Sequence, residues 1–183
     1  YNNSFQHVAD DGIDVKLSDG IVIEGNRVKG AGSDGIQLVD SEGAVIRGNR
    51  IKDTGENGIF VENALEASIT WNAIRNTGTN GIYVSGSDLA DVKFNLVKDA
   101  GANGIFVNPS DDVDIIGNFI FNSFNNGIYV LDGERALIAY NFVGSSGDNG
   151  INVYNNDDVE VKFNAVIGTG GNASAYGGNG IKV

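Results

Sequence analysis

The sequence contains no cysteine and no methionine, one proline and one histidine. Without cysteine the chain has no disulfide, no zinc–thiolate site and no thiol nucleophile. No apolar run approaches the roughly 18 residues that a membrane-spanning helix needs. Basic residues are also few, with 12 Lys and Arg against 24 Asp and Glu. The formal net charge of −12 therefore argues against nucleic acid as a general partner.

Glycine, by contrast, is abundant, with 27 among 183 residues, and apolar residues make up 41% of the chain. This length and composition suffice for one domain with its own core. Much glycine with almost no proline indicates many tight turns rather than a flexible linker. We therefore expect residues 1–183 to form a single domain.

Two residue patterns recur with the same spacing along the whole chain. The dipeptide Gly-Ile starts every 23 residues from Gly12 to Gly150, and Asn recurs every 23 residues from Asn3 to Asn164. The last Gly-Ile starts at Gly180, 30 residues after Gly150, which places a Gly-rich insertion at 168–179 in the last repeat. Two such series in one register predict that 23 residues form one structural unit.

Apolar residues also occupy fixed places in each repeat. Counted from the Gly of Gly-Ile, positions +1, +3, +9, +11 and +16 are Ile, Val, Leu or Ala throughout. The +1/+3 and +9/+11 pairs alternate as in strands with one buried face, and β-branched residues suit strands. Equivalent positions need equivalent surroundings, so each repeat is one solenoid turn, right-handed like other parallel crossovers. The sequence predicts an all-β, right-handed parallel β-helix of about eight stacked coils.

Two other folds share part of this pattern. Asn-Gly is typical of two-residue hairpin turns, but antiparallel hairpins give no reason for one 23-residue register. Residues 113–120 mimic the core of a leucine-rich repeat, yet the apolar residue expected three places earlier is Ser110. The Asn series has a structural explanation, because Asn tolerates a left-handed bend and its amide can bond to the next Asn along the stack.

The motif N-G-I-x-V followed by x-V-x-I-x-x-N-x-I occurs at residues 103–107 and 112–120. It resembles the repeat of the right-handed parallel β-helix proteins, and the resemblance covers essentially the whole chain. Its known members include polysaccharide lyases, alginate C5-epimerases, glycoside hydrolases and surface adhesins. The resemblance thus implies the architecture but no single activity. The expected location, extracellular or at the cell surface, fits a chain without cysteine. The Asp-Pro-His-Glu motif of alginate epimerases has no counterpart, since Pro109 lies between Asn108 and Ser110.

Outward columns of the solenoid supply the candidate binding residues. Positions +15 and +17 carry cations that suit a repeating anion such as an acidic polysaccharide, unless neighbouring Asp53 and Asp99 neutralise them. This basic column comprises Arg27, Lys29, Arg50, Lys52, Arg75 and Lys98. Position +2 carries aromatic rings that either stack on sugars or stack on one another across coils. This aromatic column comprises Phe60, Tyr83, Phe106 and Tyr129.

Large apolar residues replace the cations in the later coils and predict an oligomer interface or a packed loop. They are Leu96, Phe119, Phe121, Phe124 and Phe142. The sequence also starts and stops inside a repeat, which would expose strand edges. We therefore expect either caps outside this segment or coils that stack end to end.

Acidic side chains offer the one candidate for chemistry. Asp91 and Asp114 lie one coil apart at position +10, with Lys93 and Asp112 nearby. Neighbouring carboxylates can share a proton or a metal ion, so these four residues are candidates for catalysis. Acidic residues at position +7 could bind Ca²⁺, but the Gly-Gly-x-Gly-x-Asp nonapeptide is absent, and no metal or cofactor is expected.

Three functions remain open on this evidence. Regular coils and open ends favour a non-catalytic extracellular scaffold that self-associates end to end or laterally. The basic and aromatic columns favour a polysaccharide-binding module. The resemblance alone favours a piece of a polysaccharide lyase, epimerase or hydrolase. The expected partners are accordingly other copies, flanking caps or an acidic polysaccharide, and neither nucleic acid nor a membrane span.

Overall fold

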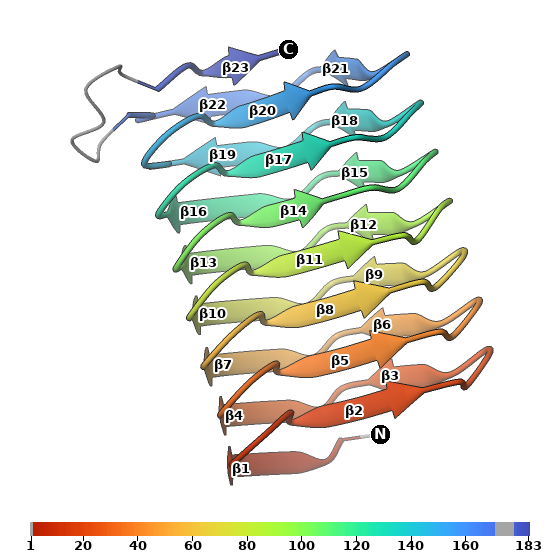
Figure 1. The fold of residues 1–183 in the computed structure, drawn as a ribbon. Helices are drawn as coiled ribbons and strands as arrows, with labels where there is room; N and C mark the ends of the chain where they lie inside the picture. Colours follow the sequence, from red (N-terminus) through yellow and green to blue (C-terminus); the bar gives the residue numbers. More distant parts are fainter. Residues whose placement is uncertain (1, 171–177) are drawn as a thin grey trace.

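The computed structural model describes residues 2–170 and 178–183 as 23 strands in three parallel sheets. In Figure 1 the chain runs left to right through the front sheet, returns behind it and climbs towards the C-terminus, so the winding is right-handed. The predicted parallel β-helix is confirmed. The Gly-rich insertion predicted at 168–179 lies, for residues 171–177, outside the described residues. No helix long and apolar enough to cross a membrane occurs in the described part of the chain.

Each sheet collects every third strand. Sheet A contains β1 (Ser4–Val8), β4 (Arg27–Ala31), β7 (Arg50–Thr54), β10 (Ala73–Thr77), β13 (Leu96–Ala100), β16 (Phe119–Ser123), β19 (Phe142–Gly144) and β22 (Ala165–Ile167). Sheet B contains β2 (Ile13–Lys16), β5 (Ile36–Val39), β8 (Ile59–Glu62), β11 (Ile82–Ser85), β14 (Ile105–Val107), β17 (Ile128–Leu131), β20 (Ile151–Tyr154) and β23 (Ile181–Lys182). Sheet C contains β3 (Val22–Glu24), β6 (Val45–Arg47), β9 (Ser68–Thr70), β12 (Asp91–Lys93), β15 (Asp114–Ile116), β18 (Leu137–Ala139) and β21 (Glu160–Lys162).

Strand pairing keeps the 23-residue register of the sequence. Ile74 of β10, for example, lies opposite Ile51 on one side and Val97 on the other. Every inward position therefore forms a column of like residues along the axis. The fully buried isoleucines of sheet B are one such column, and burial of each contributes roughly 1.5–3 kcal/mol. This apolar centre is the main source of stability.

The Asn series forms a buried hydrogen-bonded ladder at the bend between sheets C and A. Asn95, which is fully buried, accepts hydrogen bonds at Oδ1 from the backbone N–H and the side chain of Asn72, at 2.9 and 3.0 Å. Its own Nδ2 donates to the carbonyl of Ile69 and to Asn118 Oδ1. The ladder thus satisfies backbone groups that the bend removes from the sheets.

A second ladder, at the residue before each Gly-Ile, contains one buried carboxylate. Asp34 accepts hydrogen bonds from the backbone and the side chain of Asn57, while its own N–H donates to Asp11. Burial raises the pKa of Asp34 against the lowering effect of these bonds, and the charges of Asp11 and Glu56 raise it further. The charged form is therefore less favourable here than in the unfolded chain.

We expect Asp34→Asn to stabilise the fold at pH 7, because later coils already carry Asn in this place. Above the raised folded-state pKa of Asp34, ionisation of this carboxyl lowers the stability of the fold by its full amount. This loss shrinks as the pH falls through that pKa, and it vanishes below the unfolded value of 3.8. The pH-dependent part of the gain should follow the same course. Urea denaturation of both proteins between pH 3 and pH 7 measures it, and a lower midpoint for the variant at pH 7 would contradict this assignment.

Candidate functional site

Cations cover the outward face of sheet A in its N-terminal half. Alternation along each strand turns the apolar residue inward and its two neighbours outward, as with buried Val28 between Arg27 and Lys29. The strand register then places Arg27 opposite Arg50 and Lys29 opposite Lys52. Six cations thus stack over β4, β7, β10 and β13, as the sequence predicts. They are Arg27, Lys29, Arg50, Lys52, Arg75 and Lys98.

A hollow of about 410 Å³ lies among these cations and is here called the basic groove. All six cations line it, together with Ala73 and Leu96 and with atoms of the inward residues of the same strands. Ala73 lies between Arg50 and Leu96 in the cross-strand register, so its short side chain leaves room between two long ones. The groove is therefore open to a ligand that runs across the strands.

Few carboxylates neutralise this face. Lys52 pairs with Asp53 at 3.4 Å and Arg75 with Asp99 at 3.3 Å. A hydrogen bond from Asn76 and the nearby lysines lower the pKa of Asp53, so it stays ionised. Within the described residues no carboxylate lies within ion-pair distance of Arg27, Lys29, Arg50 or Lys98. Like charges opposite one another destabilise a sheet, and a bound anion would relieve them.

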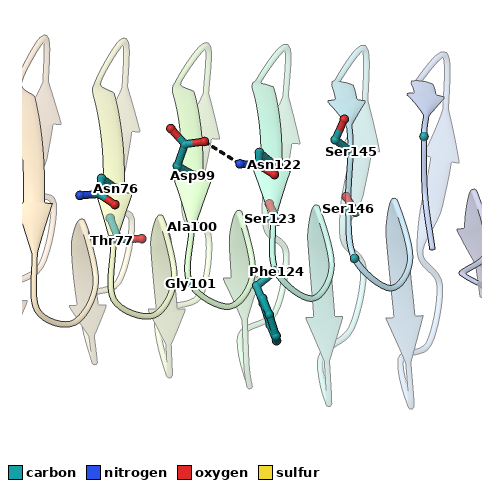
Figure 2. A pocket seen from close by; sticks show the side chains of 12 residues that line it. Asn76, Thr77, Asp99, Ala100, Gly101, Asn122, Ser123, Phe124, Ser145 and Ser146 are labelled. Carbon is teal, nitrogen blue, oxygen red and sulfur yellow. Dashed lines mark hydrogen bonds between the residues drawn. The ribbon is translucent and has the colours of Figure 1, made fainter. Parts of the chain in front are cut away.

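A second hollow, of about 460 Å³, follows the bend between sheets A and B (Figure 2). Its wall carries a row of left-handed residues that includes Asn76, Asp99, Asn122 and Ser145, and Asn122 donates to Asp99 at 2.7 Å. Asn122 and Asp99 bond to each other, and Asn76 donates to Asp53 outside the lining. Asp99, the one charged side chain among the described lining residues, already pairs with Arg75. It is the weaker candidate for a ligand site.

Two buried hydroxyls in this wall, those of Ser123 and Ser146, have no hydrogen-bond partner among the described residues. Ser123 Oγ lies 2.9 Å from the point where a Cβ on Gly104 would lie, so it faces this glycine, which directly precedes β14. In another coil the methyl group of Thr77 takes the corresponding place beside Gly58, and its hydroxyl donates to the carbonyl of Thr79. Both hydroxyls thus lie against a glycine of the preceding coil, Gly104 or Gly127. Their lack of a partner is therefore no evidence for a ligand in the hollow.

The predicted aromatic column lies on the outward face of sheet B. Ring centroids are 4.9 Å apart between Tyr83 and Phe106 and 5.1 Å between Phe106 and Tyr129, with planes within 14° of parallel. Phe60 contacts Tyr83 in a tilted arrangement at 5.4 Å. The rings thus cover one another's faces, as cross-strand pairs that stabilise a sheet do. A role in sugar binding stays a prediction, and the inner rings offer mainly their edges.

The predicted apolar patch begins with Leu96, on the same strand as Lys98, and continues along sheet A over β16 and β19. Leu96 and Phe119 are about half exposed, and Phe142 packs against Phe119 and Phe121 with centroids 6.3 and 5.2 Å apart. Phe124 is separate from them, at the bend beside the second hollow. The structure therefore brings four of the five residues together, and their role as an interface stays a prediction.

The candidate catalytic residues divide into two ion-pair groups. Lys93 Nζ lies 2.7 Å from Asp91 and 2.8 Å from Asp114. Burial works to lower the pKa of Lys93, but the hydrogen bonds that its ammonium donates to Asp114 and Asp91, with the charges of these carboxylates, outweigh it and raise the pKa. Asp112 instead forms a two-pronged ion pair with Arg135, which lowers the pKa of that carboxyl. Their catalytic role stays a prediction, and both groups are already explained as structural ion pairs.

One outward column was missed by sequence reasoning. Position +13, at the bend before sheet A, carries exposed aromatic side chains in four coils and glycine in three. Because glycine and aromatic residues share this position, no single residue type recurs in every coil. The restriction of the position to glycine or an aromatic ring from residue 25 to residue 163 was nevertheless visible in the sequence. The aromatic members are Trp71, Phe94, Tyr140 and Phe163.

Comparison with known proteins agrees with the architecture. The model of the right-handed β-helix region matches residues 1–73 and 57–183. None of the curated proteins matches the sequence. Among solved structures, the Azotobacter vinelandii mannuronan C-5 epimerase AlgE6 A-module has a TM-score of 0.74 and 19% identity, and the match covers 91% of this chain and 50% of that one.

Two further structures are similar at low identity. The periplasmic alginate epimerase AlgG has a TM-score of 0.71 and 18% identity, with 83% of this chain and 38% of that chain covered. The Dettilon tailspike protein has a TM-score of 0.62 and 16% identity, with 90% and 47% covered. The chain thus spans half or less of each of these structures, and the likeness shows the fold alone.

Proposed function

The chain belongs to the right-handed β-helix family, and we propose that it binds an acidic polysaccharide in the basic groove of sheet A. The observation that carries the proposal is the concentration of positive charge. Six of the 12 Lys and Arg residues of an acidic chain line one groove, and only two of the six have an ion-pair partner among the carboxylates that the structure describes. Such a local field attracts anions in spite of the net charge.

The arrangement suits a polymer better than a small anion. Strands repeat at about 4.8 Å, so the cations recur at that spacing across four strands. A chain of acidic sugars likewise presents one carboxylate per ring along its length. Two of the similar structures are named as epimerases of alginate or mannuronan, and alginate is an acidic polysaccharide. One of them is named as periplasmic, which supports a location outside the cytoplasm.

Charge reversal in the groove tests the proposal. We expect the double variant Arg50→Glu, Lys52→Glu to bind oligomannuronate at least about 100-fold more weakly, since each lost contact is worth about 1.4 kcal/mol or a factor of ten. Isothermal titration calorimetry in low salt measures this loss, and added salt should weaken binding by the unchanged protein.

The matched control is the double variant Lys16→Glu, Lys162→Glu. Both lysines lie outside the groove, in ion pairs with Asp14 and Glu160, and the change in net charge is the same. We expect this control to bind nearly as well as the unchanged protein. Equal losses in the two double variants would mean that net charge, and not the groove, governs binding.

A second candidate is a non-catalytic scaffold that associates laterally. The observation in its favour is the exposure of Leu96, which lines the groove, and of Phe119 on the strand that follows. Lateral association would bury this surface, and light scattering would show a molar mass that rises with concentration. The two roles overlap at one strand, because Leu96 lies on β13 with Lys98 and also lines the groove, whereas Phe119 and Phe142 lie on the strands that follow.

A further inference from the structure

We propose that Trp71 and Phe94 form an aromatic rim of the basic groove and stack on the sugar rings of the polysaccharide bound there. This inference rests on the proposed function and adds to it a basis for recognising sugar as well as charge. The two rings belong to the position +13 column, which also contains Tyr140 and Phe163. Trp71 lies two residues before Ala73, and Phe94 two residues before Leu96, and both of these later residues line the groove.

The backbone indicates that the fold does not require an aromatic ring at this position. Trp71 and Phe94 both have a φ of 58°, in the left-handed region that disfavours bulky residues by roughly 1–2 kcal/mol. The same position is glycine in other coils, with φ of 64° at Gly48 and 66° at Gly117. Trp71 nevertheless remains 65% exposed, so burial offsets little of this penalty. A strained, exposed aromatic side chain at a position that glycine also fills points to binding.

Ring packing leaves one face of Trp71 open. Phe94 stacks on Trp71 from the following coil, with centroids 4.7 Å apart and planes 21° from parallel. The preceding coil has Gly48 in the same place, and nothing lies within 4 Å of the point where its Cβ would be. The uncovered face of the indole therefore turns towards the coil that carries Arg50 and Lys52. At Gly117, in contrast, the ring of Phe94 already fills the space.

This placement fits an acidic sugar chain by two kinds of contact. A pyranose ring presents a face of C–H groups that packs on an indole, while its carboxylate reaches the neighbouring cations. An acidic polypeptide offers the carboxylates without the rings. Charge alone would bind both polymers in the groove, whereas the rim would favour the sugar. Trp71 of the rim and Ala73 of the groove lie in the same coil, two residues apart. One bound polysaccharide can therefore contact both the rim and the groove.

The single tryptophan gives a direct readout. We expect saturating oligomannuronate to shift the emission of Trp71 to shorter wavelength and to protect it from acrylamide quenching. Poly-aspartate, which calorimetry should show to bind in the groove, should leave the emission unchanged. The variant Trp71→Gly, which copies Gly48, should lose about tenfold in affinity for oligomannuronate, the loss typical of one ring-stacking contact, with no loss for poly-aspartate.

The outcomes separate the two proposals. Binding of both polymers with no response of Trp71 would overturn the aromatic rim and leave the groove intact. Binding of neither polymer would overturn both. A fall in the molar mass of the ligand-free protein on Trp71→Gly would assign the ring to a contact between copies and so overturn the rim. An unchanged or higher urea midpoint for Trp71→Gly would show that any lost affinity is not lost folding.

Discussion

Replacement of Asn95 by leucine is expected to lower the free energy of unfolding by about 3 kcal/mol or more. The side chain is fully buried, and leucine fills a similar volume without hydrogen-bonding groups. The change leaves the backbone N–H of Asn72 and the carbonyl of Ile69 without the bonds that Asn95 supplies. Each buried group that loses its partner costs about 1–3 kcal/mol. Urea denaturation followed by circular dichroism measures the loss.

The first rung of the same ladder provides a matched control. Asn3 is exposed, and its side chain donates one hydrogen bond, to Asn26 Oδ1 at 3.2 Å. We expect Asn3→Leu to cost less than about 1 kcal/mol, because water replaces an exposed hydrogen bond. Equal losses at Asn3 and Asn95 would show that the ladder does not stabilise the coils through buried hydrogen bonds.

Gly81→Ala is expected to be similarly damaging, at about 3 kcal/mol, for a steric reason. An added Cβ would lie 2.2 Å from Val97 Cγ1 and 2.6 Å from the carbonyl oxygen of Gly104 in the next coil. That oxygen accepts the backbone hydrogen bond of Ile82, so the coil cannot move away without losing it. Relief is not available from the side chain either, since Val97 is fully buried.

Gly48→Ala separates steric exclusion from backbone conformation. An added Cβ meets nothing within 4 Å there, and only the left-handed φ of 64° opposes alanine. We expect a loss of roughly 1–2 kcal/mol, smaller than at Gly81. Equal denaturation midpoints for the two variants would contradict the close approach of coils at the Gly-Ile position.

The architecture could be predicted because each step of the repeat is determined locally. A 23-residue register shared by Gly and Asn leaves one arrangement in which Ile51, Ile74 and Val97 meet the same surroundings. The same register correctly stacks the cations of sheet A and brings Asp91 beside Asp114. The sequence could not predict which ion pairs form within a column, because a long Lys or Arg side chain can reach several carboxylates. Asp112, for instance, pairs with Arg135 of the next coil and not with Lys93.

The aromatic rim escaped sequence reasoning for a different reason. Propensities place glycine or asparagine at left-handed bends, so tryptophan and phenylalanine there are not expected from local rules. The conformation of Trp71 is imposed by the stacked coils on either side, and only the structure shows it. Conversely, the outward ladder around Tyr83 was visible in the sequence, but the sequence left open whether its rings face sugars or one another.

Chemical-shift mapping tests the central claim most directly, and a chain of 19.2 kDa is within its reach. Oligomannuronate would be titrated into the ¹⁵N-labelled protein and the shifted amides assigned to strands. We predict shifts concentrated in β4, β7, β10 and β13 and at the indole N–H of Trp71. Shifts concentrated on the outward face of sheet B, or no shifts at saturating ligand, would contradict binding in the basic groove.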